Sequence, residues 1–211
     1  MTSKLVFFDR PNVIQSAGSA LRRDGSGVDR GFGEPDRGQY AQREEVFAAC
    51  GGAVLFDRRA LDDVGLLDET FFLYYEDTDL SWRMRLRGWR ILYEPTAVVE
   101  HVHTGTNVEW SPLFTFHAHR NRLFMIVKNA PCTFALRAFA SLSWRAIVTR
   151  RPSNGELAVG GAAQRSPVEL RMVIRIAVSF LAHLPEMLLK RMVIRRGRKI
   201  DDDSLLVWST R

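Results

Sequence analysis

Apolar residues follow two different spacings along this chain, and the change between them comes near residue 130. Before that point, short apolar runs alternate with polar and glycine-rich stretches, as in strands joined by loops. Residues 5–8 predict a short strand, and residues 46–56 predict a buried strand interrupted by a pair of glycines. The glycine-rich stretch 16–42 between them predicts a long exposed loop with little core of its own.

Two short helices are predicted in the next part of the chain. Asp57 is placed to cap a helix over residues 58–64, and Gly65 stands where a left-handed residue commonly ends one. The second helix begins at Asp77 or Thr78 and ends at residue 87. The side chains expected to be buried on it are Leu80, Trp82 and Met84.

Beyond this second helix, two extended pieces and then a helical region are predicted. The extended pieces, 89–93 and 96–99, are separated by Glu94 and Pro95. Helices are expected at 113–127, 134–148 and 168–196, with a polar linker at 151–166 and a kink at Pro185. The longest charge-free run of the last helix, residues 176–185, is about half the length that crosses a bilayer. These helices are therefore expected to lie on a membrane and not to cross it.

Composition places the chain among globular proteins. Of its 211 residues, 46% are hydrophobic, which is enough to bury a sizeable core. Its two cysteines, Cys50 and Cys132, lack metal-ligand spacing, and no secretory signal pattern opens the chain. Both thiols are expected to be reduced and buried, as in a cytoplasmic protein.

The charge is distributed unevenly between the two halves of the chain. Residues 1–110 carry 13 Lys and Arg against 18 Asp and Glu, a net charge of −5, whereas residues 111–211 carry 17 against 6, a net charge of +11. A basic segment favours an anionic partner. Here the basic residues alternate with aliphatic ones at helical spacing, without any recognisable nucleic-acid motif. An anionic membrane surface is therefore the expected partner, and nucleic acid is not.

Three carboxylates follow an aromatic run and are candidates for acid–base chemistry. Glu76, Asp77 and Asp79 come directly after residues 72–75, which are aromatic or aliphatic. A carboxylate beside apolar walls holds its proton more tightly and can act as a general base near neutral pH. Acidic residues at a helix N-terminus also cap free N–H groups and complement the helix dipole, so a purely structural role explains the same cluster.

Histidines and one basic segment are the other candidate binding groups. His101 and His103 would point to the same side of a strand, where both could face a metal or a phosphate, although packed or exposed imidazoles fit equally. His117 and His119 have the same spacing within a predicted helix, where residues two apart diverge, so they are interpreted as structural or surface groups. Arg120 is the first residue of the polar segment Arg120-Asn121-Arg122, which could bind phosphate or form a solvated helix face.

An ordered series of short motifs runs through the middle of the chain. The series consists of Cys50-Gly51-Gly52-Ala53, Arg58-Arg59, Val64-Gly65-Leu66-Leu67-Asp68-Glu69, Phe71-Phe72-Leu73-Tyr74-Tyr75-Glu76-Asp77-Thr78-Asp79-Leu80, the segment 85–88, Tyr93-Glu94-Pro95 and His101. Single dipeptides in it carry no information, whereas their order is specific. The series resembles the second half of glycosyltransferase family 2, particularly its bacterial rhamnosyltransferase-like members. The resemblance covers roughly residues 48–131 and extends more loosely back to Leu5.

The resemblance implies an α/β chain that forms the C-terminal portion of a GT-A fold, followed by amphipathic helices. It also implies a nucleotide-sugar donor, a divalent metal such as Mg²⁺ or Mn²⁺, and single-displacement transfer with inversion. Carried over by position, Asp77 would be the catalytic base, Glu76 would orient the acceptor or the base, and His101 would reach the metal or the donor diphosphate. His103 would take that place in a register shifted by two. The residues expected to bind substrate are Gly51, Gly52, Asp79 and Arg120.

The domain organisation expected from this resemblance is incomplete. Residues 1–130 would form the acceptor side of a GT-A domain, and residues 131–211 a basic amphipathic helical tail. The nucleotide-binding βαβ region and the metal-binding Asp-x-Asp run that open family members do not precede the resemblance. The chain is therefore interpreted as a truncated gene product, as the product of a mis-assigned start, or as a half that works with a second polypeptide supplying the donor side. The expected function is sugar transfer to a lipid-linked or polysaccharide acceptor at the cytoplasmic face of the cell membrane. The alternative is an inactive truncated homologue that binds a membrane surface or a partner.

Overall fold

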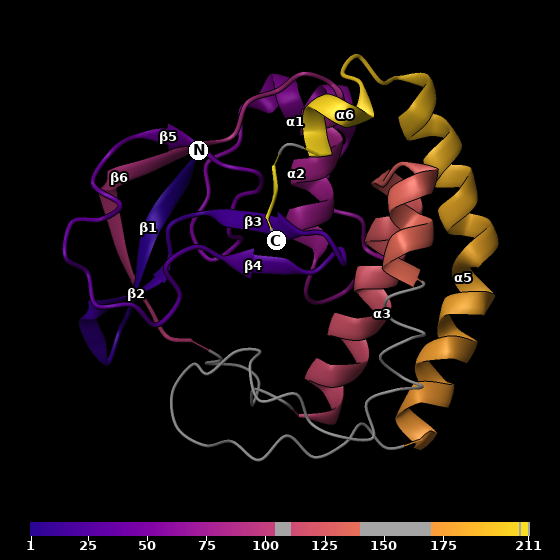
Figure 1. The fold of residues 1–211 in the computed structure, drawn as a ribbon, viewed down its shortest axis with the longest axis horizontal. Coiled ribbons are helices and arrows are strands. Elements are labelled where there is room, and N and C mark those ends of the chain that lie inside the picture. The colour runs from indigo at the N-terminus through magenta and orange to yellow at the C-terminus, as the bar shows by residue number, and fades with distance from the viewer. Residues whose placement is uncertain (104–110, 140–169, 207, 211) are drawn as a thin grey trace.

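Residues 1–103, 111–139, 170–206 and 208–210 are described by the computed structural model of the protein. The strands gather on one side of the molecule, and two long helices, α3 (Pro112–Asn129) and α5 (Leu170–Arg196), run side by side on the other (Figure 1). The α/β class expected from the sequence is confirmed.

A four-stranded sheet forms the strand side of the molecule. Its order is β2 (Arg10–Ser16), β1 (Thr2–Phe7), β6 (Leu92–His101) and β5 (Glu44–Glu45). β1 and β6 are parallel, and the other neighbours are antiparallel. The strand predicted over residues 5–8 is therefore the carboxyl end of a longer one. β2 was not expected from the sequence.

The two extended pieces predicted at 89–93 and 96–99 form one strand, β6. The pairing of β6 with β1 is irregular at Pro95: Glu94 lies opposite Ser3, and the next paired residue, Val98, lies opposite Lys4. A proline has no N–H to donate to a neighbouring strand, so an irregularity at this point is what the sequence requires.

The glycine-rich stretch 16–42 is not the exposed loop that was predicted. It holds β3 (Ser19–Arg22) and β4 (Gly27–Asp29), an antiparallel hairpin that β7 (Ser209–Thr210) extends. Leu21 is 1% exposed and belongs to the main core.

Close packing at the hairpin turn explains part of its glycine content. Gly25 has a φ of +79°, and a Cβ there would lie 2.5 Å from Cδ1 of Ile126 on α3. A glycine is therefore needed both for the left-handed conformation and for the close approach to the helix. Sequence alone does not distinguish this use of glycine from a mobile loop.

The segment 46–56 is buried only over residues 46–49, and it is not a regular strand. Phe47 and Ala48 are at most 2% exposed, whereas Leu55 is 73% exposed, so the prediction of a buried strand over the whole segment is wrong for its second half. Pairing is limited to single bridges of Ala48 with Ser19 and of Val54 with Thr2. Between these bridges the chain turns at Gly51 and Gly52.

The two short helices lie where the sequence predicts them. α1 is Arg58–Val64, with the Asp57 side chain accepting the N–H of Arg59 and Gly65 at a φ of 82° after its end. α2 is Glu76–Leu86 and begins one residue earlier than predicted. The residues expected to be buried on α2 are buried, namely Leu80, Trp82 and Met84.

The helical side agrees with the prediction in the described residues. Residues 132–139 are helical and match the start of the predicted helix 134–148, whose remainder lies outside the described residues together with the linker 151–166. α5 continues through Pro185, and α6 (Asp202–Leu206) follows it. The main core lies between these helices and the β3–β4 hairpin, where the ring of Trp82 meets Phe47 and Phe134 edge to face.

The two cysteines are free, but only one of them is shielded. Cys50 is half-buried beside the turn at Gly51, whereas Cys132 is exposed at the start of the helix that follows α3. The expectation that both thiols are buried is wrong for Cys132, because the apolar side of that helix is taken by Phe134 and Ala138.

Candidate active site

The loop before α2 has an unusual backbone that is held from α3. Phe72, Tyr74 and Tyr75 have φ values of 62°, 67° and 70°, a conformation that costs about 1–3 kcal/mol for each residue other than glycine. The fully buried Asn121 holds this backbone. Its Nδ2 lies 2.8, 2.7 and 2.9 Å from the carbonyl oxygens of Phe71, Leu73 and Tyr74.

This strained loop leads directly into the acidic N-terminus of α2. Tyr75 is the N-cap residue, and its side chain makes no capping hydrogen bond. The negative charge of the first turn comes from Glu76, Asp77 and Asp79, which complement the helix dipole. The Tyr75 hydroxyl instead lies 3.4 Å from the backbone N of Gly27 on β4. The helix start is thereby fixed against the β3–β4 hairpin.

Asp77 is held by backbone and hydroxyl donors on both of its oxygens. Oδ2 accepts the backbone N–H of Gly51 at 2.8 Å, and Oδ1 accepts the N–H and the hydroxyl of Thr78 at 2.6 and 3.1 Å. Burial raises the pKa of Asp77 against the lowering effect of these hydrogen bonds. The group is therefore a fixed carboxylate with increased basicity.

The two glycines bring Asp77 and His101 together. A Cβ on Gly51 would lie 3.2 Å from Oδ2 of Asp77, and a Cβ on Gly52 would lie 3.5 Å from Nε2 of His101. The carboxylate from α2 and the imidazole from the end of β6 therefore flank one turn. Larger residues at these two positions would crowd both groups.

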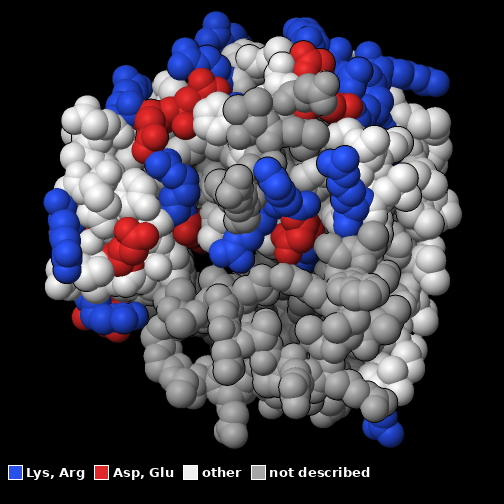
Figure 2. Space-filling view, in the orientation of Figure 1, with Lys and Arg blue, Asp and Glu red and all other residues white. Residues whose placement is uncertain are grey.

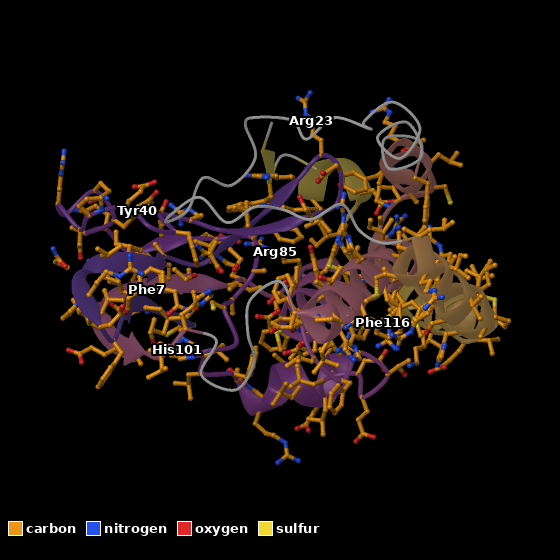
Figure 3. The ribbon with its side chains drawn as sticks, turned by 90° about the horizontal axis from the view of Figure 1, so that it is seen from below. Phe7, Arg23, Tyr40, Arg85, His101 and Phe116 are labelled. Atoms are coloured by element: carbon orange, nitrogen blue, oxygen red, sulfur yellow. The ribbon has the colours of Figure 1, made fainter. Side chains whose placement is uncertain are left out.

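Gln15 of β2 orients the imidazole of His101. Its side-chain oxygen lies 2.9 Å from Nδ1 of His101, and its amide nitrogen lies 3.3 Å from Nδ1 of His103. Because an amide oxygen only accepts, Nδ1 of His101 is the donor in this contact, and Nε2 of His101 lies beside Gly52. Figure 3 shows His101 near Phe7, opposite which it pairs in the sheet.

His103 has different surroundings. Its ring packs edge to face against Phe7 and Phe32, with ring centroids 5.6 and 5.3 Å apart. The structure thus places His101, and not His103, beside the glycine turn.

Glu76 carries a buried oxygen with no hydrogen-bond partner among the described residues, Oε2. Burial and the neighbouring Asp77 carboxylate raise the pKa of Glu76. A buried carboxylate oxygen without a donor is costly unless another group approaches it, so this oxygen is free to accept a hydrogen bond.

Asp29, on β4, is a further carboxylate of this region that the sequence did not single out. Its Oδ1 accepts the hydroxyls of Ser16 and Ser19 at 2.8 and 2.9 Å. Burial, with a smaller contribution from the charge of Asp77, raises the pKa of Asp29 to about 6. Burial and the charge of Asp29 in turn raise the pKa of the Cys50 thiol, which makes that thiol a poor nucleophile. In the sequence, Asp29 stands in a glycine-rich stretch that resembles a loop.

Replacing Asp29 by Asn is expected to stabilise the fold at neutral and alkaline pH. The folded-state pKa of about 6 lies above the ordinary value of 3.8, so the stability contributed by the protonated carboxyl is complete below pH 3.8 and is lost as pH rises through 6. Asn cannot ionise and can accept both serine hydroxyls. The variant should exceed the wild type in free energy of unfolding by about 3 kcal/mol at pH 8 and match it near pH 4.

Urea denaturation at a series of pH values measures this difference. Asp9→Asn is the matched control, because Asp9 is an exposed residue whose side chain is 73% accessible. A stability difference for Asp29→Asn that does not change with pH would contradict the assigned ionisation.

Asp79 and Arg120, expected to bind substrate, lie elsewhere. Asp79 has no exposed surface, and its carboxylate contacts Arg83 and Lys128 at 2.9 Å and Asn129 at 2.7 Å. These contacts give it a structural role, because they join α2 to the carboxyl end of α3.

Arg120 lies on the helical side of the molecule. Its Nη2 donates to the carbonyl oxygens of Thr70 and Phe71 at 3.1 Å, and its guanidinium lies 5.1 Å from the ring centre of Phe116. Figure 3 shows Phe116 among the helices, well apart from His101. Arg120 therefore supports the strained loop together with Asn121, and sequence reasoning had not assigned this role to either residue. His117, at 3.2 Å from Arg120, is buried and structural.

The described residues do not form a metal site by themselves. Among residues 1–103, 111–139 and the described C-terminal part, no group of three His, Cys, Asp or Glu side chains is placed to hold a metal ion. Nε2 of His101 could give one ligand.

Comparison with known proteins was made for the whole chain. Residues 32–122 match the family model described as glycosyltransferase like family 2. This segment belongs to glycosyltransferase family 2. It contains Gly51, Gly52, Glu76, Asp77 and His101, so the glycine turn and the groups beside it all lie inside the family 2 segment. The mixed sheet and the helices that follow it are consistent with a portion of the GT-A fold.

Two curated proteins are similar to the chain. Both are named N-acetylglucosaminyl-diphospho-decaprenol L-rhamnosyltransferase, from Mycobacterium tuberculosis strains CDC 1551 / Oshkosh and ATCC 25618 / H37Rv. Each is 31% identical over 99 residues, which is 44% of this chain and 32% of the relative. The chain thus spans about a third of the length of the curated relatives it matches. No solved structure matches.

Proposed function

We propose that this chain forms the acceptor side of an inverting glycosyltransferase in which Asp77 is the general base. The observation that supports this most strongly is the Gly51–Gly52 turn, which has the Asp77 carboxylate on one side and the His101 imidazole on the other. Gly51 and Gly52 are both exposed, so a sugar hydroxyl can approach the carboxylate at this turn.

The chemistry of this proposal is a single displacement. The acceptor hydroxyl gives its proton to a carboxylate oxygen of Asp77 while its own oxygen forms a bond to the anomeric carbon of the donor. The bond from that carbon to the nucleoside diphosphate breaks, and the diphosphate leaves with the bonding electrons. Attack opposite the leaving group inverts the anomeric configuration. The raised pKa of Asp77 makes it a better base for this step near neutral pH.

Glu76 is proposed to orient the acceptor. Its Oε2 is buried and lacks a partner among the described residues, so it can accept a second hydroxyl of the same sugar. Two accepting carboxylates on consecutive residues would fix the direction of the attacking hydroxyl, and such positioning contributes strongly to rate.

The donor is proposed to be a nucleotide sugar held largely by groups outside the described residues. A divalent cation such as Mg²⁺ or Mn²⁺ would offset the charge of the departing diphosphate. His101 is the ligand that this chain would contribute. A second polypeptide, or a further segment of a longer one, would supply the rest of the donor side.

The acceptor is proposed to be a lipid-linked or polysaccharide glycan of the cell envelope, with transfer at the cytoplasmic face of the cell membrane. The curated relatives carry names that specify a decaprenol-linked acceptor. The basic C-terminal half and the apolar helix α5 are consistent with work at an anionic membrane surface.

A second candidate function is a membrane-surface or partner-binding homologue without catalysis. The apolar outward side of α5 favours it, because that side would serve membrane binding whether or not sugar is transferred. Membrane binding without nucleotide-sugar binding would identify this second function.

Calorimetric titration with nucleotide sugars tests the catalytic proposal. The protein should be used alone and joined to a donor-binding half, with and without Mn²⁺. Metal-dependent binding is expected in the joined protein, and His101→Ala should weaken it at least tenfold, about 1.4 kcal/mol. Failure of the joined protein to bind any nucleotide sugar would sink the proposal. Binding that His101→Ala leaves unchanged would remove His101 from the donor site.

Replacing Gly51 by Ala is expected to reduce transfer while leaving the fold intact. The new Cβ would lie 3.2 Å from Oδ2 of Asp77 and 3.3 Å from its Cβ, so the carboxylate must shift. A misplaced base costs about tenfold to a hundredfold in rate. Thermal unfolding should show that Gly51→Ala keeps its fold. Unchanged transfer by Gly51→Ala would show that Asp77 is not held through this turn.

A further inference from the structure

The outward side of α5 is an uninterrupted apolar surface. Between residues 177 and 193, every exposed residue of this helix is apolar. At 1.5 Å per residue this surface is about 25 Å long. Figure 2 shows the corresponding flank of the molecule as white between blue side chains near its two ends. We name these residues the α5 apolar face; they are Ala177, Val178, Leu181, Ala182, Pro185, Leu188, Leu189, Met192 and Val193.

Basic residues stand at both ends of the α5 apolar face. Arg171 and Arg175 are exposed before it, and Arg196, Arg198 and Lys199 are exposed after it. No acidic residue is exposed on α5, because Glu186, its one acidic residue, is half-buried and paired with Lys190 at 2.6 Å. An apolar stripe with basic ends matches the acyl boundary and the anionic headgroups of a lipid surface.

The inward side of α5 packs apolar residues such as Met187 against the main core, and it also makes polar contacts with the rest of the protein. Lys190 contacts Asp68 and the Thr70 hydroxyl at 2.7 and 2.9 Å. Arg191 donates to the carbonyl oxygens of Val127 and Ala130 at 2.8 and 2.6 Å. These groups are satisfied by α3 and by the loop that leads to α2.

This inward side also holds the loop that presents the site. Glu186 accepts the Thr70 hydroxyl at 2.9 Å, and Lys128 of α3 contacts the same Asp68 as Lys190, at 2.6 Å. Residues 68–75 continue directly into Glu76 and Asp77. One helix therefore has lipid-compatible residues on its outer side and contacts to the site loop on its inner side.

We propose that α5 lies in the plane of an anionic lipid bilayer surface, with the α5 apolar face at the acyl boundary and its inward side on the protein. By length and composition α5 could also cross a membrane. A crossing helix, however, would draw Glu186, Lys190 and Arg191 into the hydrocarbon and break their contacts with Asp68, Thr70 and α3, at a cost of several kcal/mol for each charge. The in-plane arrangement keeps all of these contacts.

A lipid surface fits the α5 apolar face better than a second copy of the chain does. Two copies packed face to face would bring basic ends against basic ends, whether the helices ran parallel or antiparallel. Anionic headgroups are complementary to both ends at once. The inference concerns the membrane surface and stands independently of sugar transfer.

Vesicle flotation of the full chain tests this inference. Binding is expected with phosphatidylcholine vesicles that contain phosphatidylglycerol, and it should weaken at high salt. Leu181→Glu should reduce the bound fraction at least about tenfold, because it removes apolar burial and places a negative charge among lipids. The matched control is Leu55→Glu: Leu55 is 73% exposed beside Met1 at the N-terminal end of the sheet, and its substitution should leave binding unchanged.

The outcomes separate lipid binding, membrane crossing and self-association. Alkaline carbonate should release the bound chain, and retention after carbonate would overturn the in-plane arrangement. Sedimentation without lipid should not reveal a dimer. A dimer that Leu181→Glu dissociates, together with absent or unchanged vesicle binding of that variant, would overturn the lipid assignment in favour of a second copy of the chain. Unchanged thermal unfolding of both variants confirms that they are folded.

Discussion

Replacing Asp77 by Asn is expected to lower the rate of sugar transfer by about 10²- to 10⁴-fold. Asn keeps the shape and can still accept the Gly51 N–H through its side-chain oxygen, but its amide nitrogen cannot accept from Thr78, so thermal unfolding is measured alongside the rate. It cannot take the proton of the acceptor hydroxyl. The loss should therefore appear in the rate of transfer at saturating substrate and not in the binding of the nucleotide sugar. Single-turnover transfer of labelled sugar measures this rate.

The pH profile gives an independent check of the same assignment. Because burial raises the pKa of Asp77, the wild-type rate should fall on acidification at a pH above that expected for an exposed carboxylate. The residual activity of Asp77→Asn should not show this fall on acidification. Asp62→Asn is the control, since Asp62 is an exposed residue of α1. Full activity of Asp77→Asn would assign the base elsewhere.

Replacing Asp79 by Ala is expected to destabilise the protein by about 3 to 5 kcal/mol. The Asp79 carboxylate is fully buried and neutralises Arg83 and Lys128, both of which are almost completely buried. Its removal leaves Arg83 without its carboxylate and Lys128 with only Asp68. Chemical denaturation measures the change in free energy of unfolding.

The exposed pair Arg58–Asp62 provides the contrast. Its side chains are 85% and 60% exposed, so Asp62→Ala should cost less than about 1 kcal/mol although the two charges lie only 2.8 Å apart. A similar small effect for Asp79→Ala would show that the buried cluster does not hold α2 to α3.

Local signals in the sequence predicted much of the fold that surrounds the site. The N-cap at Asp57 and the left-handed Gly65 delimit α1 through interactions within a few residues, and these are confirmed. α2 was predicted within one residue because acidic residues stand in its first turn and Gly88 follows its end. Such features depend on neighbouring residues, and neighbours are visible in a sequence.

Pairing between distant segments could not be predicted in this way. β2 and the β3–β4 hairpin are short and rich in polar and glycine residues, and they become ordered by packing against β1, β6 and α3. The role of Asp29 follows from that pairing. Asn121 likewise acts over about fifty residues of chain, by holding the carbonyl oxygens of Phe71, Leu73 and Tyr74.

The candidate site was predicted in part. The family resemblance singled out Asp77, Glu76, His101 and the two glycines, and the structure brings Asp77 and His101 to one turn. Their catalytic roles stay predictions. Asp79 is two residues from Asp77 and looks equivalent in the sequence, yet on α2 it faces the core, because residues two apart on a helix point in different directions.

Transfer of labelled sugar to a lipid-linked glycan acceptor is the decisive measurement for the proposed function. The chain would be incubated, alone and joined to a donor-binding half, with a panel of nucleotide sugars and acceptor-containing vesicles. We expect label to enter the lipid phase in a linkage whose anomeric configuration is opposite to that of the donor. A product with the donor's configuration, or no label in the lipid phase although the nucleotide sugar binds, would contradict an inverting acceptor-side site at Asp77.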